Sequence, residues 1–302
     1  MEPLPLAHIG LLVEDVDLAR RRWSAALGMP FSPVTRYRPD NWSDIDNPRP
    51  HLSDARLTFC LGENPSIEVI EFTGTGTHSP TKGAGGHHIA FPPVRDNRAT
   101  RAALAQQGIG TDGTIEHDGR LIFMFSDARA LNNVFTEWVE EHPGHADTKD
   151  DLSPVNRLPD GTKTLFDVET ITALGGVRPT LPMTDIYIAV DDLDAATQSW
   201  QSVTGYTFRP NQTRSAAVGS AESSPTRIHL VLHGDPLRPQ GLYQAVVEVT
   251  DLDAERRRLI RDQVPSRELP EGPGPQIVIE GDFLCQFTLI LRQALSGTGS
   301  PV

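Results

Sequence analysis

The chain contains the stretch HIGLLVEDVDLARRRWSAALG at residues 8–28, and it returns to the same pattern with DIYIAVDDLDAATQSWQSVTG at residues 185–205. An aspartate, a tryptophan and a glycine recur at one constant offset: Asp15 with Asp192, Trp23 with Trp200, and Gly28 with Gly205. A repeat of this kind indicates the organisation of the whole chain before any single residue is interpreted.

The physical pattern of the repeated unit predicts a strand followed by a capped helix. Residues 8–13 are an apolar run bounded by polar residues, which is typical of a buried strand. Asp15 follows where an N-cap belongs, because its carboxylate can accept the free N–H groups of a helix. Apolar residues then recur at helical spacing until Gly28, which favours a helix end: Val16, Ala19, Trp23, Ala26 and Leu27.

Each half also repeats within itself. His88-Ile89-Ala90-Phe91 resembles His8-Ile9-Gly10-Leu11, and a helix is expected from about 98 to 107, ending at Gly108. In the second half a strand at 244–249 precedes Asp251, which caps a helix to about Arg261. Short strands are expected after the four helices near 31–37, 55–62, 66–72, 110–117, 121–126, 133–140, 206–210, 214–218, 227–233, 265–269, 276–280 and 284–291. The pattern predicts an α+β fold of four βαβββ modules.

The same reading divides the chain into four parts. We expect one domain at 1–145, a linker at 146–182 rich in turn-forming residues, a second domain at 183–293 and a tail at 294–302. A short strand or helix is expected inside the linker at 165–174.

Composition limits the classes of function. The chain has 302 residues with 22% charged and 38% hydrophobic residues, which is typical of a globular protein. The net charge of -13 disfavours nucleic acid and anionic membranes as partners. The two distant cysteines, the lack of a signal peptide and the lack of a run of about 20 apolar residues predict a cytoplasmic protein.

The four modules, with the strand motifs H-I-G at residues 8–10 and H-H-I-A-F at 87–91, resemble the vicinal oxygen chelate superfamily. This superfamily includes glyoxalase I, methylmalonyl-CoA epimerase, extradiol dioxygenases and bleomycin- and fosfomycin-resistance proteins. The resemblance covers roughly residues 5–142 and 183–292. It implies two paired vicinal-oxygen-chelate domains, in each of which two modules curl into a cup and metal ligands come from the first and last strands of each module.

The resemblance implies that the N-terminal half holds one divalent metal ion (Ni, Zn, Co, Mn or Fe) through His8, Glu68, His88 and Glu137. This order is similar to that of glyoxalase I, whereas the run Phe125-Ser126-Asp127-Ala128-Arg129 is more similar to methylmalonyl-CoA epimerase. His87 is expected to point to the opposite face of its strand from His88, which is the histidine that aligns with His8.

Two imidazoles and two carboxylates suit a borderline divalent ion and leave two coordination positions open. A small-molecule substrate with neighbouring oxygens can fill these positions. The metal then stabilises the enolate or oxyanion that develops, and Glu137 or Glu68 is the candidate general base.

The second half does not repeat the ligand set. Asp185 stands in place of His8, His229 in place of Glu68, Tyr243 or Gln244 in place of His88, and Leu289 in place of Glu137. We therefore expect a degenerate module pair, which makes the chain either a monomer with an internal pseudo-dimer or a homodimer.

A long loop from about 37 to 53 is a candidate cover for the site, since long loops often carry function. Trp42, Arg49 and His51 within it are candidate substrate-binding residues for an acidic or aromatic substrate. Asp127 and Arg129 are expected to form a turn with a local ion pair.

Three functions remain open from the sequence. The first is a metal-dependent lyase or isomerase that abstracts a proton next to a chelated carbonyl. The second is an extradiol-type iron(II) dioxygenase, whose facial triad His8, His88 and Glu137 could supply. Glu68 argues against it, as does the position of the set in the N-terminal half, since such enzymes usually carry the metal in the C-terminal half. The third is a bleomycin-resistance-like small-molecule binding protein.

Overall fold

Both copies of the repeated stretch form a strand and a capped helix. Strand β1 (His8–Val13) leads into helix α1 (Val16–Leu27), where the Asp15 carboxylate accepts the Leu18 amide at 2.9 Å and Gly28 ends the helix at φ 65°. Strand β12 (Met183–Val190) leads in the same way into helix α5 (Leu193–Thr204), capped by Asp192 and ended by Gly205 at φ 70°. The predicted strand, cap and stop are confirmed in both halves.

The computed structural model describes residues 2–60, 65–141, 156–157, 163–164, 182–233, 240–269 and 274–294. Nearly all of the predicted linker, including 165–174, and the tail beyond residue 294 lie outside these ranges. Within the linker, β10 (Asn156–Arg157) and β11 (Lys163–Thr164) form an antiparallel pair. The division into domains at 1–145 and 183–293 stays a prediction.

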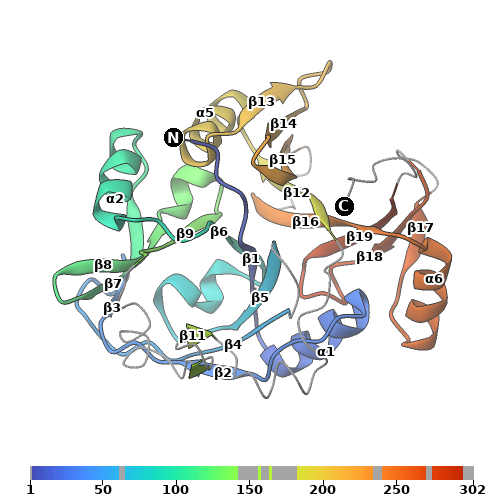
Figure 1. Cartoon of the computed structure of the whole chain (residues 1–302), viewed down its shortest axis with the longest axis horizontal. Helices are drawn as coiled ribbons and strands as arrows, with labels where there is room; N and C mark the ends of the chain where they lie inside the picture. Colours follow the sequence, from blue (N-terminus) through green and yellow to red (C-terminus); the bar gives the residue numbers. More distant parts are fainter. Residues whose placement is uncertain are drawn as a thin grey trace.

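The N-terminal half forms a nine-stranded sheet in the order β2-β4-β5-β1-β6-β9-β8-β7-β3 (Figure 1). Its two modules join where β1 and β6 pair antiparallel. Their other elements are β2 (Thr35–Tyr37), β3 (Trp42–Ser43), β4 (Ala55–Phe59), β5 (Ser66–Glu71), β6 (Gly85–Ala90), α2 (Asn97–Gln106), β7 (Thr111–His117), β8 (Arg120–Ser126) and β9 (Phe135–Val139). Three short 3₁₀ helices also occur: η1 (Gly76–His78), η2 (Pro80–Lys82) and η3 (Ala128–Leu131).

The C-terminal half repeats this arrangement in an eight-stranded sheet of order β13-β14-β15-β12-β16-β19-β18-β17. The further elements are β13 (Thr207–Pro210), β14 (Ala216–Ala221), β15 (Ser224–Leu232), β16 (Gly241–Val249), α6 (Leu252–Arg261), β17 (Arg267–Leu269), β18 (Gln276–Ile279) and β19 (Thr288–Gln293). The predicted α+β class with four βαβββ modules is thus confirmed. The strand expected at 284–291 begins only at Thr288, because Cys285 and Gln286 adopt positive φ values of 57° and 68° in the preceding turn.

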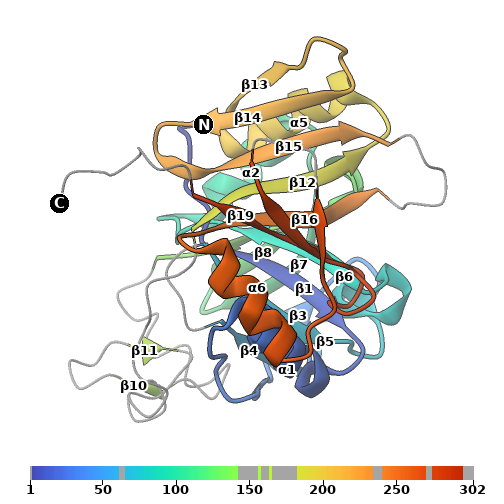
Figure 2. The ribbon, with the colours of Figure 1, turned by 90° about the vertical axis from the view of Figure 1, so that its right-hand side faces the viewer.

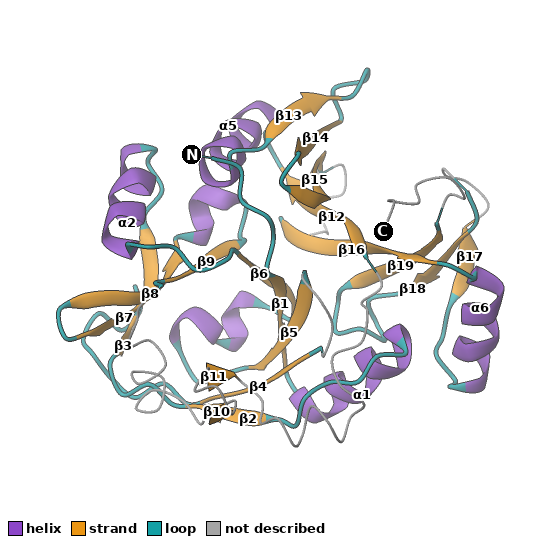
Figure 3. Cartoon of the chain, viewed as in Figure 1, coloured by secondary structure: helices purple, strands orange, loops and turns teal. Residues whose placement is uncertain are grey.

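Alternation along β1 separates the two faces of the sheet. Ile9, Leu11 and Val13 belong to the main core together with Trp23 of α1, whereas Leu12 belongs to a separate apolar cluster on the other face. In a strand, successive side chains point to opposite faces, so His8 and Gly10 share the face of Leu12. In Figure 3 the labelled α-helices of the described residues, α1, α2, α5 and α6, lie at the periphery of the two curved sheets.

The two halves pack through a pseudo-symmetric pair of contacts, and Figure 2 shows their sheets one above the other. Trp23 of α1 contacts Phe287 in the turn before β19, with ring centroids 5.8 Å apart. Its counterpart Trp200 of α5 donates from Nε1 to Asn132 Oδ1 at 3.3 Å, in the turn before β9. One apolar core runs through both halves. None of the described helices is long and apolar enough to cross a membrane.

Candidate metal centre

The four predicted ligands come from the four central strands of the first sheet, which lie in the order β5-β1-β6-β9. Gly10 of β1 is paired with Glu68 on one side and with His88 on the other. Ala90 of β6 is paired with His8 and with Glu137. The small residues Gly10 and Ala90 thus lie between the four predicted ligands, whose side chains converge on one face of the sheet.

The structure brings these four side chains together. His88 Nε2 lies 3.1 Å from Glu68 Oε2, 3.2 Å from Glu137 Oε2 and 3.1 Å from His8 Nε2. His8 Nε2 lies 3.4 Å from Glu68 Oε2 and 3.6 Å from Glu137 Oε2. Among the described residues this is the only group of three or more His, Cys, Asp or Glu whose ligand atoms all lie within 4.8 Å of one another.

The protonation of the set follows from its own charges. Burial by itself lowers the pKa of His8, but Glu137 and Glu68 outweigh it and raise that pKa to about 10. The same balance raises the pKa of His88. Burial raises the pKa of both carboxylates, yet the two imidazoles hold the pKa of Glu68 and of Glu137 below its usual value. The imidazoles thus favour the charged form of the two carboxylates, and the carboxylates favour the charged form of the imidazoles.

The set fits a divalent transition metal by distance and by charge. Adjacent ligands held at about 2.1 Å from an ion are about 3.0 Å apart in an octahedral and about 3.4 Å apart in a tetrahedral arrangement. The separations of 3.1–3.6 Å match this range. A divalent ion would balance the negative charge of the two carboxylates in this buried group.

Gly10 provides the space in which His88 lies. A Cβ atom at Gly10 would be 1.9 Å from His88 Cε1 and 2.2 Å from His88 Nδ1. His88 is fully buried, while the side chains of His8 and Glu137 keep 15% and 13% exposure. The set is therefore closed behind His88 and open on the side of His8 and Glu137.

The prediction that His87 points to the opposite face of its strand from His88 is wrong. The pairing of β1 with β6 shifts register so that Leu11 pairs with Gly86 and Gly10 with His88, which leaves His87 as the extra residue of a β-bulge. The bulge breaks the alternation of faces. His87 Nδ1 therefore lies 3.0 Å from His88 Nδ1, and the ring packs on Phe135 with centroids 4.7 Å apart.

Aromatic side chains that are not among the predicted ligands surround the set. Phe59 packs edge-on against His8 at 5.5 Å, and Phe125 packs against His88 at 5.1 Å. Burial and the charges of Glu137 and Glu68 raise the pKa of the Tyr37 phenol well above its usual value, so Tyr37 stays neutral. Spacing alone offered no signal for these residues, since their nearness depends on the curl of the sheet.

The loop residues predicted to bind substrate lie in different settings. Trp42 is 2% exposed and packs on Phe125 at 6.2 Å, with its Nε1 donating to Asp44 Oδ2 at 2.9 Å. Arg49 is exposed, and His51 Nδ1 lies 3.0 Å from the Arg49 carbonyl. Within the described residues, neither Arg49 nor His51 forms a hydrogen bond or ion pair with the four-residue set. Their role in substrate binding stays a prediction.

Two further features lie near the centre. Asp127 caps η3 and forms the expected ion pair with Arg129, with Arg129 Nε 3.0 Å from both carboxylate oxygens. A cavity of about 1050 Å³ lies between the halves and is lined by His87 and Phe135 on one side and by Gly241 and Leu242 on the other.

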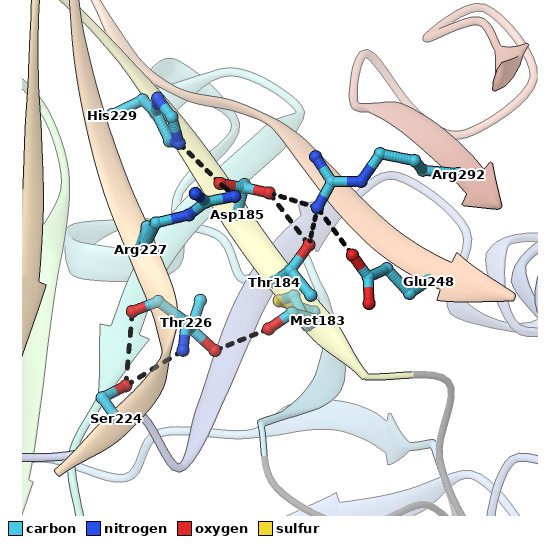
Figure 4. A network of polar contacts seen from close by, with 9 residues as sticks. All are labelled: Met183, Thr184, Asp185, Ser224, Thr226, Arg227, His229, Glu248 and Arg292. Carbon is cyan, nitrogen blue, oxygen red and sulfur yellow. Dashed lines mark hydrogen bonds and ion pairs between the residues drawn. The ribbon is translucent and has the colours of Figure 1, made fainter. Parts of the chain in front are cut away.

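In the second half, an ion-pair network is centred on Asp185, which stands in place of His8 and contacts His229, which stands in place of Glu68 (Figure 4). Asp185 Oδ1 lies 2.6 Å from His229 Nε2 and 2.8 Å from Arg227 Nη2, and Asp185 Oδ2 lies 3.0 Å from Arg292 Nη2. The strand pairing corrects the residue expected in place of Glu137. Glu137 pairs with Ala90 in the first sheet, and the equivalent pair in the second sheet is Ile290 with Val246. Ile290, one residue beyond Leu289, therefore replaces Glu137. Tyr187 replaces Gly10 and stacks on His229 at 4.3 Å.

Comparisons with known proteins concern the family model and the fold. A family model described as the glyoxalase/bleomycin resistance protein/dioxygenase superfamily matches residues 7–123. No curated protein matches the chain in sequence.

Solved structures share the fold over almost the whole chain. A mutant of 4-hydroxymandelate synthase from Streptomyces coelicolor is 12% identical with a TM-score of 0.59, over 99% of this chain and 95% of that one. A fusion of a xylose isomerase-like TIM barrel with 4-hydroxyphenylpyruvate dioxygenase is 11% identical with a TM-score of 0.58, over 99% of this chain and 50% of that one. A hypothetical protein from Staphylococcus aureus is 6% identical with a TM-score of 0.55, over 96% and 99% of the two chains. At these identities the likeness concerns the fold alone.

Proposed function

We propose that the chain, whose residues 7–123 match the glyoxalase/bleomycin resistance protein/dioxygenase superfamily, is a metal-dependent lyase or isomerase that removes a proton next to a carbonyl of a small-molecule substrate. The observation that carries the proposal is the converging set of His8, Glu68, His88 and Glu137 in the first cup. Two carboxylates in one set provide both a metal ligand and a base.

The four side chains would hold one divalent ion, which polarises a carbonyl and stabilises the negative charge that develops on its oxygen. His88, fully buried and lodged against Gly10, fixes the set from behind. Glu68 is less exposed than Glu137, at 7% against 13%. Glu68 is thus the better anchor and Glu137 the better base.

Glu137 Oε2 accepts the proton from the substrate carbon in this proposal and returns it to a neighbouring carbon or to the leaving group. Glu137 lies next to His8 on the open side of the set, where a substrate can reach it. Phe59, Phe125 and Tyr37 supply apolar walls beside the set, which favours a substrate with an apolar or aromatic part. Water is thereby kept away from the reacting carbon.

Glu137→Gln tests the assignment of the base. Glutamine keeps an oxygen donor but cannot accept the proton, so we expect metal to be retained and turnover to fall roughly 10²- to 10⁴-fold. The measurement is deuterium incorporation from D₂O into 2-oxoaldehyde adducts and acyl-CoA thioesters by the metal-loaded protein. The matched control is Glu71→Gln on the same strand as Glu68, since Glu71 pairs with Arg56 instead. Full turnover with full metal in Glu137→Gln would contradict a base role.

An extradiol-type dioxygenase is the second candidate, and the ligand set is the observation that favours it. His8, His88 and Glu137 provide the two histidines and one carboxylate that such iron(II) enzymes use. Glu68 then occupies a position that oxygen or substrate needs. Oxygen consumption with catechols by the iron-loaded protein would favour this function over the first.

A further inference from the structure

A chain of three polar groups runs away from the set behind His88. His88 turns its Nε2 towards Glu68 and Glu137, and its Nδ1 lies 3.0 Å from His87 Nδ1. His87 Nε2 in turn lies 3.0 Å from the Thr77 carbonyl oxygen. All three residues are buried, with exposures of 0% for His88, 4% for His87 and 1% for Thr77.

The Thr77 carbonyl, the last group in this series of hydrogen bonds, determines which ring nitrogens carry protons. A carbonyl oxygen can only accept, so His87 must carry its proton on Nε2. With that proton in place, Nδ1 of a neutral His87 is an acceptor. The facing His88 Nδ1 must then be the donor, because two bare ring nitrogens at 3.0 Å would leave two buried acceptors without a partner.

We propose that His87 is a positioning residue, which holds His88 as the Nδ1–H tautomer and thereby leaves His88 Nε2 free as the metal ligand. The inference rests on the proposed metal site for its purpose, but its hydrogen-bond chain exists without a metal. A ligating histidine is generally oriented by an acceptor for its other ring nitrogen, and here that acceptor is a second histidine.

The bulge that carries His87 is itself fixed by the second half of the chain. Gly86 precedes it, and a Cβ atom there would lie 2.0 Å from the Leu242 carbonyl oxygen of β16. The backbone of β16 therefore fits closely against the bulge. His87 also packs on Phe135 and lines the cavity between the halves. The C-terminal half thus helps to position a residue behind a metal ligand of the N-terminal half.

Neutrality of His87 is consistent with its surroundings. His87 is only 4% exposed, its two ring nitrogens face the Thr77 carbonyl and the His88 ring, and no carboxylate of the described residues forms an ion pair with it. A neutral ring with its one proton held by Thr77 remains an acceptor for His88 whether or not His88 Nε2 carries a proton. The donor and acceptor roles in these two hydrogen bonds are therefore the same in the metal-free and metal-bound protein.

Two matched substitutions test the proposal through metal affinity. His87→Phe keeps the aromatic packing and removes both hydrogen bonds, so we expect the dissociation constant for Zn²⁺, measured by competition with a chromogenic chelator, to rise roughly 10- to 100-fold. His87→Asn keeps an acceptor at the position of Nδ1 and should recover most of the affinity. His78→Phe is the control, because His78 packs on His87 with ring centroids 5.2 Å apart and its Nε2 has no hydrogen-bond partner.

A spectroscopic measurement on the unmodified protein shows which ring nitrogens donate in these hydrogen bonds, even if a variant fails to fold. In ¹⁵N-histidine-labelled, metal-free protein, His87 should show a protonated Nε2 and a bare Nδ1, while His88 Nδ1 should be protonated. A protonated His87 Nδ1 would overturn the inference, as would a His87→Phe protein that binds Zn²⁺ as tightly as His78→Phe. If the unmodified protein bound no Zn²⁺, the proposed function would fail, whereas the ring protonation pattern would still test the inference by itself.

Discussion

Gly10→Ala is expected to abolish tight metal binding, even though the substitution adds only a single methyl group. The added Cβ would lie 1.9 Å, 2.2 Å and 2.4 Å from three atoms of the His88 ring. His88 is fully buried and cannot move into solvent, so its ring must leave the set or the strands must separate. We expect an affinity loss of more than about 100-fold, as for loss of a ligand, and a destabilisation of about 1–3 kcal/mol from overpacking.

Gly74→Ala is the matched control, because a Cβ atom at Gly74 meets nothing within 4 Å. Zn²⁺ titration and urea unfolding of both variants separate the loss of the site from a general effect of replacing glycine. Unchanged Zn²⁺ affinity in Gly10→Ala would show that His88 is not held against Gly10 as a ligand.

Asp185→Asn is expected to destabilise the protein by about 3 kcal/mol, the cost of breaking a buried ion pair. Asp185 is fully buried and is surrounded by Arg227, His229 and Arg292. The substitution removes the negative charge and leaves Arg292, with only 12% of its side chain exposed, facing a neutral amide. Urea unfolding at pH 7 measures the difference from the unmodified protein.

The pH dependence of this difference has a definite sign. Burial raises the pKa of Asp185, but His229, Arg227 and Thr184 together hold it well below its usual value. A carboxylate with a depressed pKa stabilises the folded state fully above its unfolded pKa of about 3.9 and loses this effect as the pH falls through the folded pKa. The difference between Asp185→Asn and the unmodified protein should therefore be full at pH 7 and shrink below about pH 4.

Asp194→Asn provides the control for this experiment. Asp194 pairs with Arg214 at 2.8 Å, but both side chains are exposed, at 81% and 66%. Exposed pairs contribute about 0–1 kcal/mol, so little change is expected at any pH. Equal effects of the two substitutions would show that the Asp185 network is not a stabilising link between strands.

The repeated stretch was sufficient to predict the modules, because each of its structural signals depends only on residues close together in the sequence. A cap at Asp15, an apolar helix face around Trp23 and a stop at Gly28 are properties of neighbouring residues, and the second copy ends the same way at Gly205. The resemblance placed four ligands on strand positions that pair through Gly10 and Ala90, and the structure brings their side chains together.

What the sequence did not predict depends on register and on contacts between distant segments. His87 shares the face of His88 only because the pairing of β6 with β1 contains a bulge, which no spacing rule foretells. The counterpart of Glu137 was one residue off, at Leu289 instead of Ile290, because the register of β19 is set by its pairing with the distant strand β16. Trp42 was assigned to the long loop at 37–53, yet it lies in β3, which pairs with β7, and its ring is buried.

Metal content of the protein purified without added metal tests the central claim most directly, with His88→Ala Glu137→Ala as the comparison. We predict about one transition-metal ion per chain, absent from the variant, because the two substitutions remove half of the ligand set. Nickel, zinc, cobalt or manganese would favour the lyase or isomerase, and iron would favour the dioxygenase. No metal in either protein, even after reconstitution, would contradict the account and leave a bleomycin-resistance-like binding protein as the better interpretation.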